Sequence, residues 1–224
     1  MLGRKISFLL FFAVTLSLLG VGAAAWNKSQ EANSIPLSNL TAEQRSVAQY
    51  LIEAEWQLGR LSLEERLYRL SEFYINDPRF PLSPEQKRFV QQMLPLLGDT
   101  VEPVSERWGQ LTFEQAWTKR LIEGYSLLQR MEAGQVNSQE VARMRQKGIE
   151  PIETRPPYQS RKEAEELFDF YAFEKNTREG IVCVLHRFGD AKAKSCLVEQ
   201  GGHWYIAYRK VFPWASLPPT ESQK

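Results

Sequence analysis

Two short glycine-containing segments, Gly189-Asp190 and Gly201-Gly202, divide the C-terminal part of the chain into three runs of β-forming residues. Each segment has the length and composition of a two-residue hairpin turn. The runs cover residues 181–188, 191–200 and 203–212. We therefore expect an antiparallel meander of three strands, in which each turn sets the register of the strands on either side.

The first turn also places the two cysteines of the chain opposite each other. If residue 188 pairs with residue 191, then Cys183 pairs with Cys196, at a position without ladder hydrogen bonds where Cα atoms lie about 4.5 Å apart. This separation is within the range of disulfides. The sequence therefore predicts a disulfide in an exported protein, and the alternative is a pair of buried free thiols in a cytosolic protein.

Four basic residues fall on one face of the predicted sheet. The register places Arg187 opposite Lys192, and Lys194 opposite Arg209, although like charges in these positions repel. Such a face either extends its side chains to water and nearby glutamates, or binds an anionic surface such as phospholipid head groups or an acidic protein segment. The other face should pack on a helix, and there His186 would be a hydrogen-bonded core histidine.

A helix is expected directly before the strands. Ser160 and Glu163 form a helix-start pattern, and residues 167–173 are rich in aromatic side chains that would be mostly buried. Three prolines lie within residues 149–160, which therefore form a stiff connection and the boundary between two domains. The C-terminal unit, residues 161–212, would then be one helix on a three-stranded antiparallel sheet.

The region before this connection, residues 41–148, repeats one pattern at the expected helix starts: a Ser or Thr followed three residues later by Glu or Gln. This is the capping box, whose side chains satisfy amide groups that the first helical turn leaves unpaired. The first three boxes are 21 residues apart, but capping boxes are common, so we favour an irregular helical bundle over a repeat solenoid. The boxes start at Thr41, Ser62, Ser83 and Thr112, and the expected helices cover about 41–58, 62–75, 83–97, 112–133 and 138–147.

The first 25 residues have the features of an export segment. Arg4 and Lys5 precede an uncharged run over residues 6–26, which is long enough to cross a membrane as a helix. Because small residues occupy positions 23–25, the segment is either a cleaved signal peptide or an uncleaved membrane anchor. Both alternatives export the rest of the chain, which would be periplasmic or anchored in the inner membrane. The polar segments on either side of the folded part would be a linker and a tail, residues 26–40 and 213–224.

The composition narrows the functional classes. The 224 residues carry a net charge of +1, so no basic surplus indicates nucleic-acid binding. Two cysteines and two histidines leave little material for a metal site, and the sequence motifs of phosphate-binding loops, zinc proteases and serine hydrolases are missing, so no metal or cofactor is predicted. The large aromatic residues are expected in the core, not as a carbohydrate platform; among them are Trp56, Trp108, Trp117 and Trp204.

Together these features predict an α+β fold, a mainly helical bundle followed by a C-terminal helix packed on a three-stranded antiparallel meander. The expected function is that of a non-enzymatic exported or membrane-anchored cell-envelope protein, acting as a protein-binding, scaffold or assembly module. Its partners would be a protein and, if residues 6–26 are not cleaved, the membrane. The alternative is a secreted hydrolase whose catalytic carboxylates the sequence does not identify.

Overall fold

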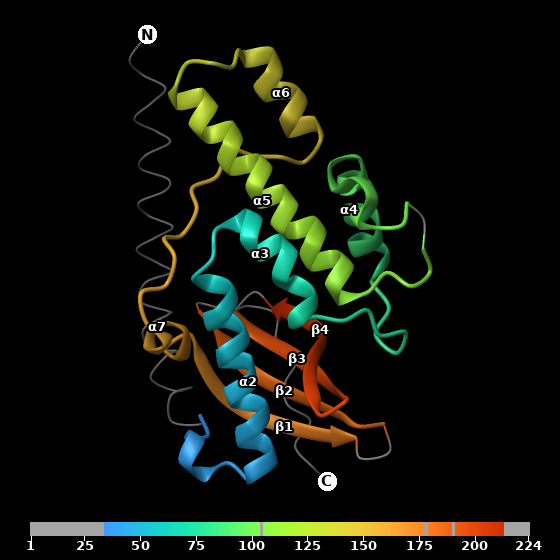
Figure 1. The fold of residues 1–224 in the computed structure, drawn as a ribbon, viewed down its shortest axis with the longest axis vertical. Coiled ribbons are helices and arrows are strands. Elements are labelled where there is room, and N and C mark those ends of the chain that lie inside the picture. The colour runs from blue at the N-terminus through green and yellow to red at the C-terminus, as the bar shows by residue number, and fades with distance from the viewer. Residues whose placement is uncertain (1–33, 104, 177–178, 190, 213–224) are drawn as a thin grey trace.

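Helices cover one face of a four-stranded antiparallel sheet, so the chain has an α+β fold (Figure 1). The computed structural model describes residues 34–103, 105–176, 179–189 and 191–212. The α-helices are α2 Ala42–Gly59, α3 Leu63–Arg69, α4 Pro84–Leu97, α5 Gln110–Glu132, α6 Ser138–Gln146 and α7 Arg161–Glu165, and the short 3-10 helices are η1 Leu37–Asn39, η2 Leu70–Glu72 and η3 Gly98–Thr100. The strands, in their order across the sheet, are β1 Phe168–Asn176, β2 Ile181–Phe188, β3 Ala191–Gln200 and β4 His203–Phe212.

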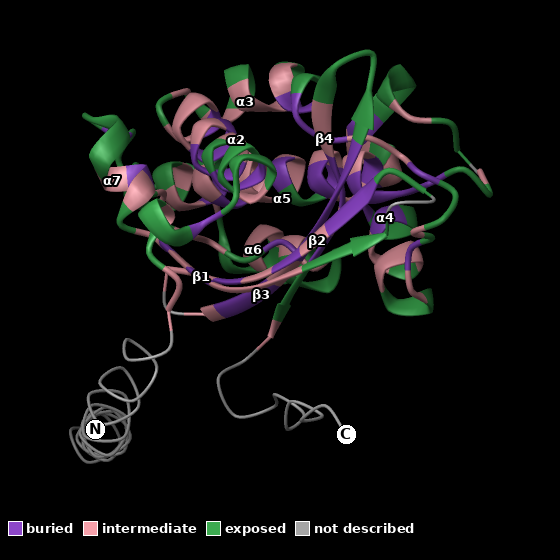
Figure 2. Cartoon of the chain, turned by 90° about the horizontal axis from the view of Figure 1, so that it is seen from below, coloured by how far each residue is buried: buried purple, intermediate pink, exposed green. Residues whose placement is uncertain are grey.

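The two larger of three apolar clusters join the helices to one another and to the sheet. The larger lies between α2 and the helix-facing side of the sheet, and includes Leu51 and Val184. The second joins α4 to α5 and to the segment after α6, and includes Met93 and Ile149. Figure 2 shows the buried residues between the helices and the sheet. Helix α2 therefore shares a core with strands that lie far along the sequence.

Three of the four predicted capping boxes are confirmed. Thr41, Ser62 and Ser83 each accept a hydrogen bond from the amide three residues later, and the Gln or Glu at that position accepts one from the capping residue's own amide. These pairs close the starts of α2, α3 and α4. Local sequence was enough to locate them because both partners lie within one helical turn.

The fourth box was wrong, because a residue from another segment caps that helix. Helix α5 begins at Gln110, two residues before the predicted cap at Thr112. The Oδ1 atom of Asn76 accepts from the amides of Gly109 and Thr112, and its Nδ2 donates to the Thr112 hydroxyl at 2.9 Å. Asn76 thus supplies the oxygen that a local Ser or Thr normally provides.

The second predicted helix is shorter than expected because its end joins the sheet. Helix α3 stops at Arg69 and continues only as η2. The chain then runs beside strand β4: the Ile206 amide donates to the Phe73 carbonyl at 2.8 Å, and the Ile75 amide donates to the Ile206 carbonyl at 3.2 Å. These bonds occupy the open edge of β4.

The predicted helix over residues 160–173 was wrong beyond Glu165, where α7 ends after five residues. Residues 168–176 form strand β1, which pairs antiparallel with β2 and makes the sheet four-stranded where three strands were expected. A register shift between Phe170 and Ala172 interrupts the alternation of this strand. Because of this bulge, the aromatic residues 168, 170 and 173 are spaced by two and then by three, which obscures the two-residue period of a strand.

The three predicted strands and the register of the first hairpin are confirmed. Residue 188 pairs with residue 191, and Cys183 forms a disulfide with Cys196 across β2 and β3, with the Cα atoms 3.9 Å apart. The register of the second hairpin shifts by one residue between Leu197 and Cys196. Beyond this bulge, the residue opposite Lys194 is Lys210 and not Arg209, so this predicted pair was wrong.

The predicted export or anchor segment, residues 1–25, lies outside the described residues, as does the tail, residues 213–224. Of the expected linker, residues 34–40 are described, and they contain η1. Within the described part of the chain, no helix combines the length and hydropathy that a membrane crossing requires. The predicted domain boundary at residues 149–160 stays a prediction.

Candidate binding site between the helices and the sheet

Two adjacent cavities open between the helices and the sheet. The first, of about 590 Å³, lies between α2, α3, α5 and the proline-rich segment after α6. The second, of about 740 Å³, lies between α4, α5 and the ends of β2 and β4. Arg66 and Phe188 line both cavities, so these two side chains form their common wall.

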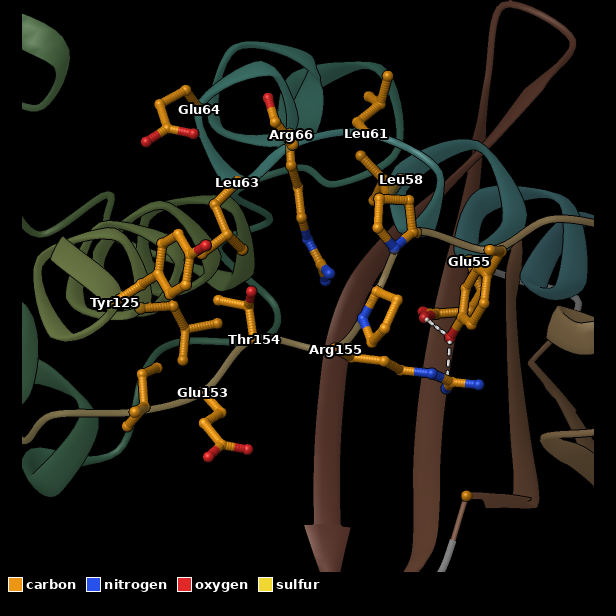
Figure 3. A pocket seen from close by; sticks show the side chains of 18 of the residues that line it. Glu55, Leu58, Leu61, Leu63, Glu64, Arg66, Tyr125, Glu153, Thr154 and Arg155 are labelled. Carbon is orange, nitrogen blue, oxygen red and sulfur yellow. Dashed lines mark hydrogen bonds between the residues drawn. The ribbon is translucent and has the colours of Figure 1, made fainter. Parts of the chain in front are cut away.

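The proline-rich segment, which carries Thr154 and Arg155, forms one wall of the first cavity (Figure 3). A buried tyrosine, Tyr158, holds it in place. The Tyr158 hydroxyl donates to Oε1 of Glu55 at 2.9 Å and accepts from Nη1 of Arg155 at 3.1 Å. The Arg155 guanidinium also covers the tyrosine ring, 4.4 Å from its centroid. Burial, together with the nearby Glu55 carboxylate, raises the pKa of Tyr158, so the hydroxyl stays protonated and remains a donor.

The close approach of this segment to α2 depends on a glycine. The Tyr158 amide donates to the Gly59 carbonyl at 3.1 Å. A Cβ atom on Gly59 would lie 1.9 Å from Cε2 of Tyr158, which no side chain can tolerate. Gly59 therefore allows the tyrosine ring to pack directly on the helix backbone.

Arg66 extends from α3 into the first cavity, between Tyr125 on one side and Glu55 on the other (Figure 3). Its Nε atom is the only buried side-chain nitrogen or oxygen among the described residues without a hydrogen-bond partner. The guanidinium also forms no ion pair with any residue that the structure describes. A buried donor without a partner costs about 1–3 kcal/mol, so Arg66 requires an explanation beyond packing.

Arg209, in contrast, is satisfied within the protein. It is only 9% exposed in the wall of the second cavity. Its Nη1 donates to the Tyr74 hydroxyl at 3.0 Å, and its Nε donates to Oγ of Ser195 at 3.2 Å. Burial opposes the charge, but Tyr74 and the carboxylates of Glu114 and Glu55 outweigh it and raise the pKa of Arg209, which therefore remains a cation.

A buried amide connects α5 to the edge strand at the floor of the second cavity. Oε1 of Gln110 accepts from the Arg209 amide at 2.9 Å, and its Nε2 donates to Oε1 of Glu114 at 2.9 Å. All three residues are buried. Gln110 thereby provides hydrogen-bond partners for both the Arg209 amide of β4 and the Glu114 carboxylate.

The second cavity also has an aromatic wall. Its aromatic lining residues are Phe113, Trp117, Phe188 and Tyr208. Trp117 is 40% exposed, so the expectation that it belongs to the core was wrong, whereas Trp108 is buried as expected. The Trp117 ring contacts Phe89, with centroids 5.8 Å apart, and the Arg120 guanidinium lies 5.3 Å from its centroid.

The prediction that His186 is a hydrogen-bonded core histidine is confirmed. The side chain is fully buried, with Nδ1 2.9 Å from the Arg187 carbonyl and Nε2 2.9 Å from Oγ of Ser195. Burial, with a smaller effect of Arg209, lowers the pKa of His186 to about 3. This serine–histidine pair lies inside the core, where no substrate can reach the hydroxyl.

The four basic residues predicted to bind anions do not form one surface. Arg187 pairs with Asp169 at 2.5 Å and Lys194 with Glu174 at 2.7 Å. Lys192 is buried opposite Arg187, with its ammonium 5.2 Å from a tyrosine ring centroid. Arg209 projects from the opposite, helix-facing side, because the bulge in the second hairpin reverses its orientation.

Of the residues that line the cavities, sequence reasoning named Arg209 and Trp117 but missed Glu55 and Arg66. Glu55 follows Leu51 by four positions and precedes Leu58 by three, so it lies on the buried stripe of α2, and a charge in that position was the one local signal. Arg66 had no such signal, because a basic residue in the last turn of a helix is ordinary.

The described residues contain no group of three or more His, Cys, Asp or Glu side chains arranged to hold a metal ion. Comparison of the chain with protein-family models, curated proteins and solved structures finds no match. The function is therefore inferred from the geometry of the two cavities.

Proposed function

We propose that the protein is a non-enzymatic binding module and that the cleft between its helices and sheet takes up a small anion at Arg66. The observation that carries this proposal is the guanidinium itself. It lies in the common wall of the two cavities and has no hydrogen bond or ion pair among the described residues, and its Nε is shielded from water. A carboxylate or phosphate bound in the cavity would pair with this guanidinium, in the forked geometry that arginine favours.

The neighbouring charged groups support this assignment because each already has a partner. Glu55 accepts from Tyr158, and Glu114 accepts from Gln110. Arg209 donates to Tyr74 and to Ser195. Of the buried and half-buried charged groups that line the two cavities, Arg66 is therefore the one whose side chain forms no hydrogen bond within the described residues.

The location proposed for this module is outside the cytoplasm, as a periplasmic or membrane-anchored protein of the cell envelope. Two observations support it: the disulfide between Cys183 and Cys196, and the uncharged run over residues 6–26. Cell fractionation of the tagged full-length protein tests the location. Recovery in the cytoplasmic fraction with reduced cysteines would contradict it.

A secreted hydrolase is the second candidate, and the observation that favours it is the burial of two carboxylates, Glu55 and Glu114, in the walls of the cleft. The hydrogen bonds of both carboxylates to protein groups favour a structural role instead. Release of product from chromogenic esters and glycosides, abolished in Glu55→Gln or Glu114→Gln, would establish the hydrolase.

Titration with acetate and with inorganic phosphate tests the binding proposal. Either anion should raise the melting temperature of the protein above that in sodium chloride of equal ionic strength, and Arg66→Gln should remove this increase. Arg69→Gln is the matched control, because Arg69 lies on the same helix but outside both cavities and pairs with Glu72. An equal increase in Arg66→Gln would overturn the proposal.

A further inference from the structure

We infer that the anion bound at Arg66 carries an aromatic ring, and that this ring lies in the second cavity against Trp117. The inference rests on the proposed function, because it takes Arg66 as the site of the charged group. It adds the chemical class of the ligand, an acid that carries an aromatic ring. The inference is supported by the four aromatic side chains that line the second cavity, one of which, Trp117, is 40% exposed.

The second cavity offers flat apolar surface next to a cation. Phe113 and Trp117 line it from α5, while Phe188 and Tyr208 line it from the sheet. Because Phe188 shares the common wall with Arg66, a ring in this cavity lies beside the guanidinium. Aromatic rings in contact are stabilised beyond the burial of their area, so this wall favours a planar ligand.

Trp117 is unusual among the large side chains because 40% of it remains exposed. One part of its ring contacts Phe89 and the Arg120 guanidinium, which hold it in a defined orientation. Trp117 also lines the second cavity, where a ligand ring would cover part of it from water. A tryptophan held in this way is preorganised for stacking.

The polar groups of the second cavity argue against a sugar as the ligand. Ser83 and Gln86 bond to each other's amides at the start of α4, and Gln110 bonds to Glu114 and to the Arg209 amide. A sugar requires donors and acceptors for its hydroxyls. The side-chain oxygens of Ser83, Gln86 and Gln110 already accept hydrogen bonds within the protein, so they are less available to a polyol, whereas the aromatic wall suits an apolar ring.

The lining of the first cavity is different and favours an aliphatic ligand. Beside Tyr125, Tyr158 and the shared Phe188, its apolar lining is mostly aliphatic: Leu58, Leu61, Leu63, Leu121, Ile152 and Leu167. An aliphatic acid bound there would also reach Arg66. The two cavities therefore predict two different ligand preferences at one guanidinium, which experiment can separate.

Isothermal titration calorimetry of the full-length protein with four probes distinguishes the ligand classes. The probes are 3-phenylpropionate, its uncharged amide 3-phenylpropanamide, octanoate and glucuronate. We expect 3-phenylpropionate to bind best of the three acids. Its amide should bind about tenfold more weakly or worse, because it lacks the charge that pairs with Arg66.

Two variants with matched controls locate the probe. Arg66→Gln should weaken 3-phenylpropionate binding about tenfold, whereas Arg69→Gln should leave it unchanged. Trp117→Ala should weaken it about fivefold, Trp117→Phe should restore most of the loss, and Tyr68→Ala is the control because Tyr68 is an exposed aromatic residue outside both cavities. Circular dichroism melting of each variant verifies that it folds.

The outcomes separate this inference from the proposed function. Preference for octanoate, or binding of 3-phenylpropionate that needs Arg66 but is unaffected by Trp117→Ala, would overturn the aromatic ligand and leave anion binding intact. Preference for glucuronate would do the same in favour of an acidic sugar. If no probe depends on Arg66, both the inference and the proposed function are wrong.

Discussion

Ser195 Oγ lies 2.9 Å from Nε2 of His186, and neither side chain is exposed to solvent. The other ring nitrogen, Nδ1, lies 2.9 Å from the Arg187 carbonyl, which can only accept. Nδ1 must therefore carry the proton, and Nε2 accepts from the serine hydroxyl. Arg209 donates to the same hydroxyl oxygen, so a neutral imidazole is connected to a buried guanidinium through one serine.

The neutral state of His186 makes folding stability dependent on pH. Burial lowers its pKa to about 3, so between pH 6.5 and pH 3 the unfolded chain binds a proton here that the folded protein does not. The free energy of unfolding should therefore fall as the pH falls below about 6.5, by at most about 1.4 kcal/mol per pH unit from this group. Urea unfolding between pH 4.5 and 7 measures the slope.

Substitution of each histidine separates this effect from other acid-sensitive groups. His186→Gln should reduce the slope, while His203→Gln should not, because His203 is exposed at a hairpin turn. Equal slopes in the protein and in His186→Gln would contradict the assignment.

Arg66→Met should stabilise the ligand-free protein. The change removes a buried donor without a partner and keeps a side chain of similar length, so we expect the free energy of unfolding to rise by about 1 kcal/mol. Chemical denaturation measures it. Arg69→Met, which breaks an exposed pair with Glu72, should change stability by less than about 1 kcal/mol. A loss of stability in Arg66→Met would mean that its guanidinium is satisfied in solution.

Loss of the disulfide should lower the free energy of unfolding by about 3 kcal/mol on the chain-entropy account, because Cys183 and Cys196 are 13 residues apart. Unfolding with and without dithiothreitol measures the difference. The double variant Cys183→Ala, Cys196→Ala is the control, and the reductant should not affect it. Intact-mass measurement that finds two free thiols in the native protein would refute the bridge.

Gly59→Ala should destabilise the protein by about 2 kcal/mol, although alanine favours a helix by about 1 kcal/mol over glycine. The added Cβ would displace the Tyr158 ring and break its hydrogen bond to Glu55. In a Tyr158→Ala background the same change should become neutral or stabilising, because the clash is gone. Thermal melts of the four proteins of this cycle provide the measurement, and equal effects in both backgrounds would show that no clash exists.

The features that sequence alone determined are those whose partners lie close together in the chain. The capping boxes at Thr41, Ser62 and Ser83 each join residues three apart. The first hairpin is similar, since its turn sets a register that extends without interruption to the cysteines. Local sequence is sufficient in these cases because the geometry of one turn defines both partners.

Tertiary structure decided the features whose partners come from distant segments. Helix α5 begins where Asn76 reaches its amides, and residues 168–176 become a strand because β2 provides a paired edge. A one-residue bulge in the second hairpin then turns Arg209 toward the helices. None of these outcomes follows from propensity, because each depends on a bond or a shift made after the chain has folded back.

The candidate site is the clearest case of this division. The sequence contains Glu55, Arg66 and Tyr158 without any motif that connects them. Only packing of α2, α3 and the proline-rich segment over the sheet brings them into one cavity. The same packing leaves the Arg66 Nε without an acceptor among the described residues, because hydrogen-bond satisfaction depends on which groups meet in space and not on their order in the chain.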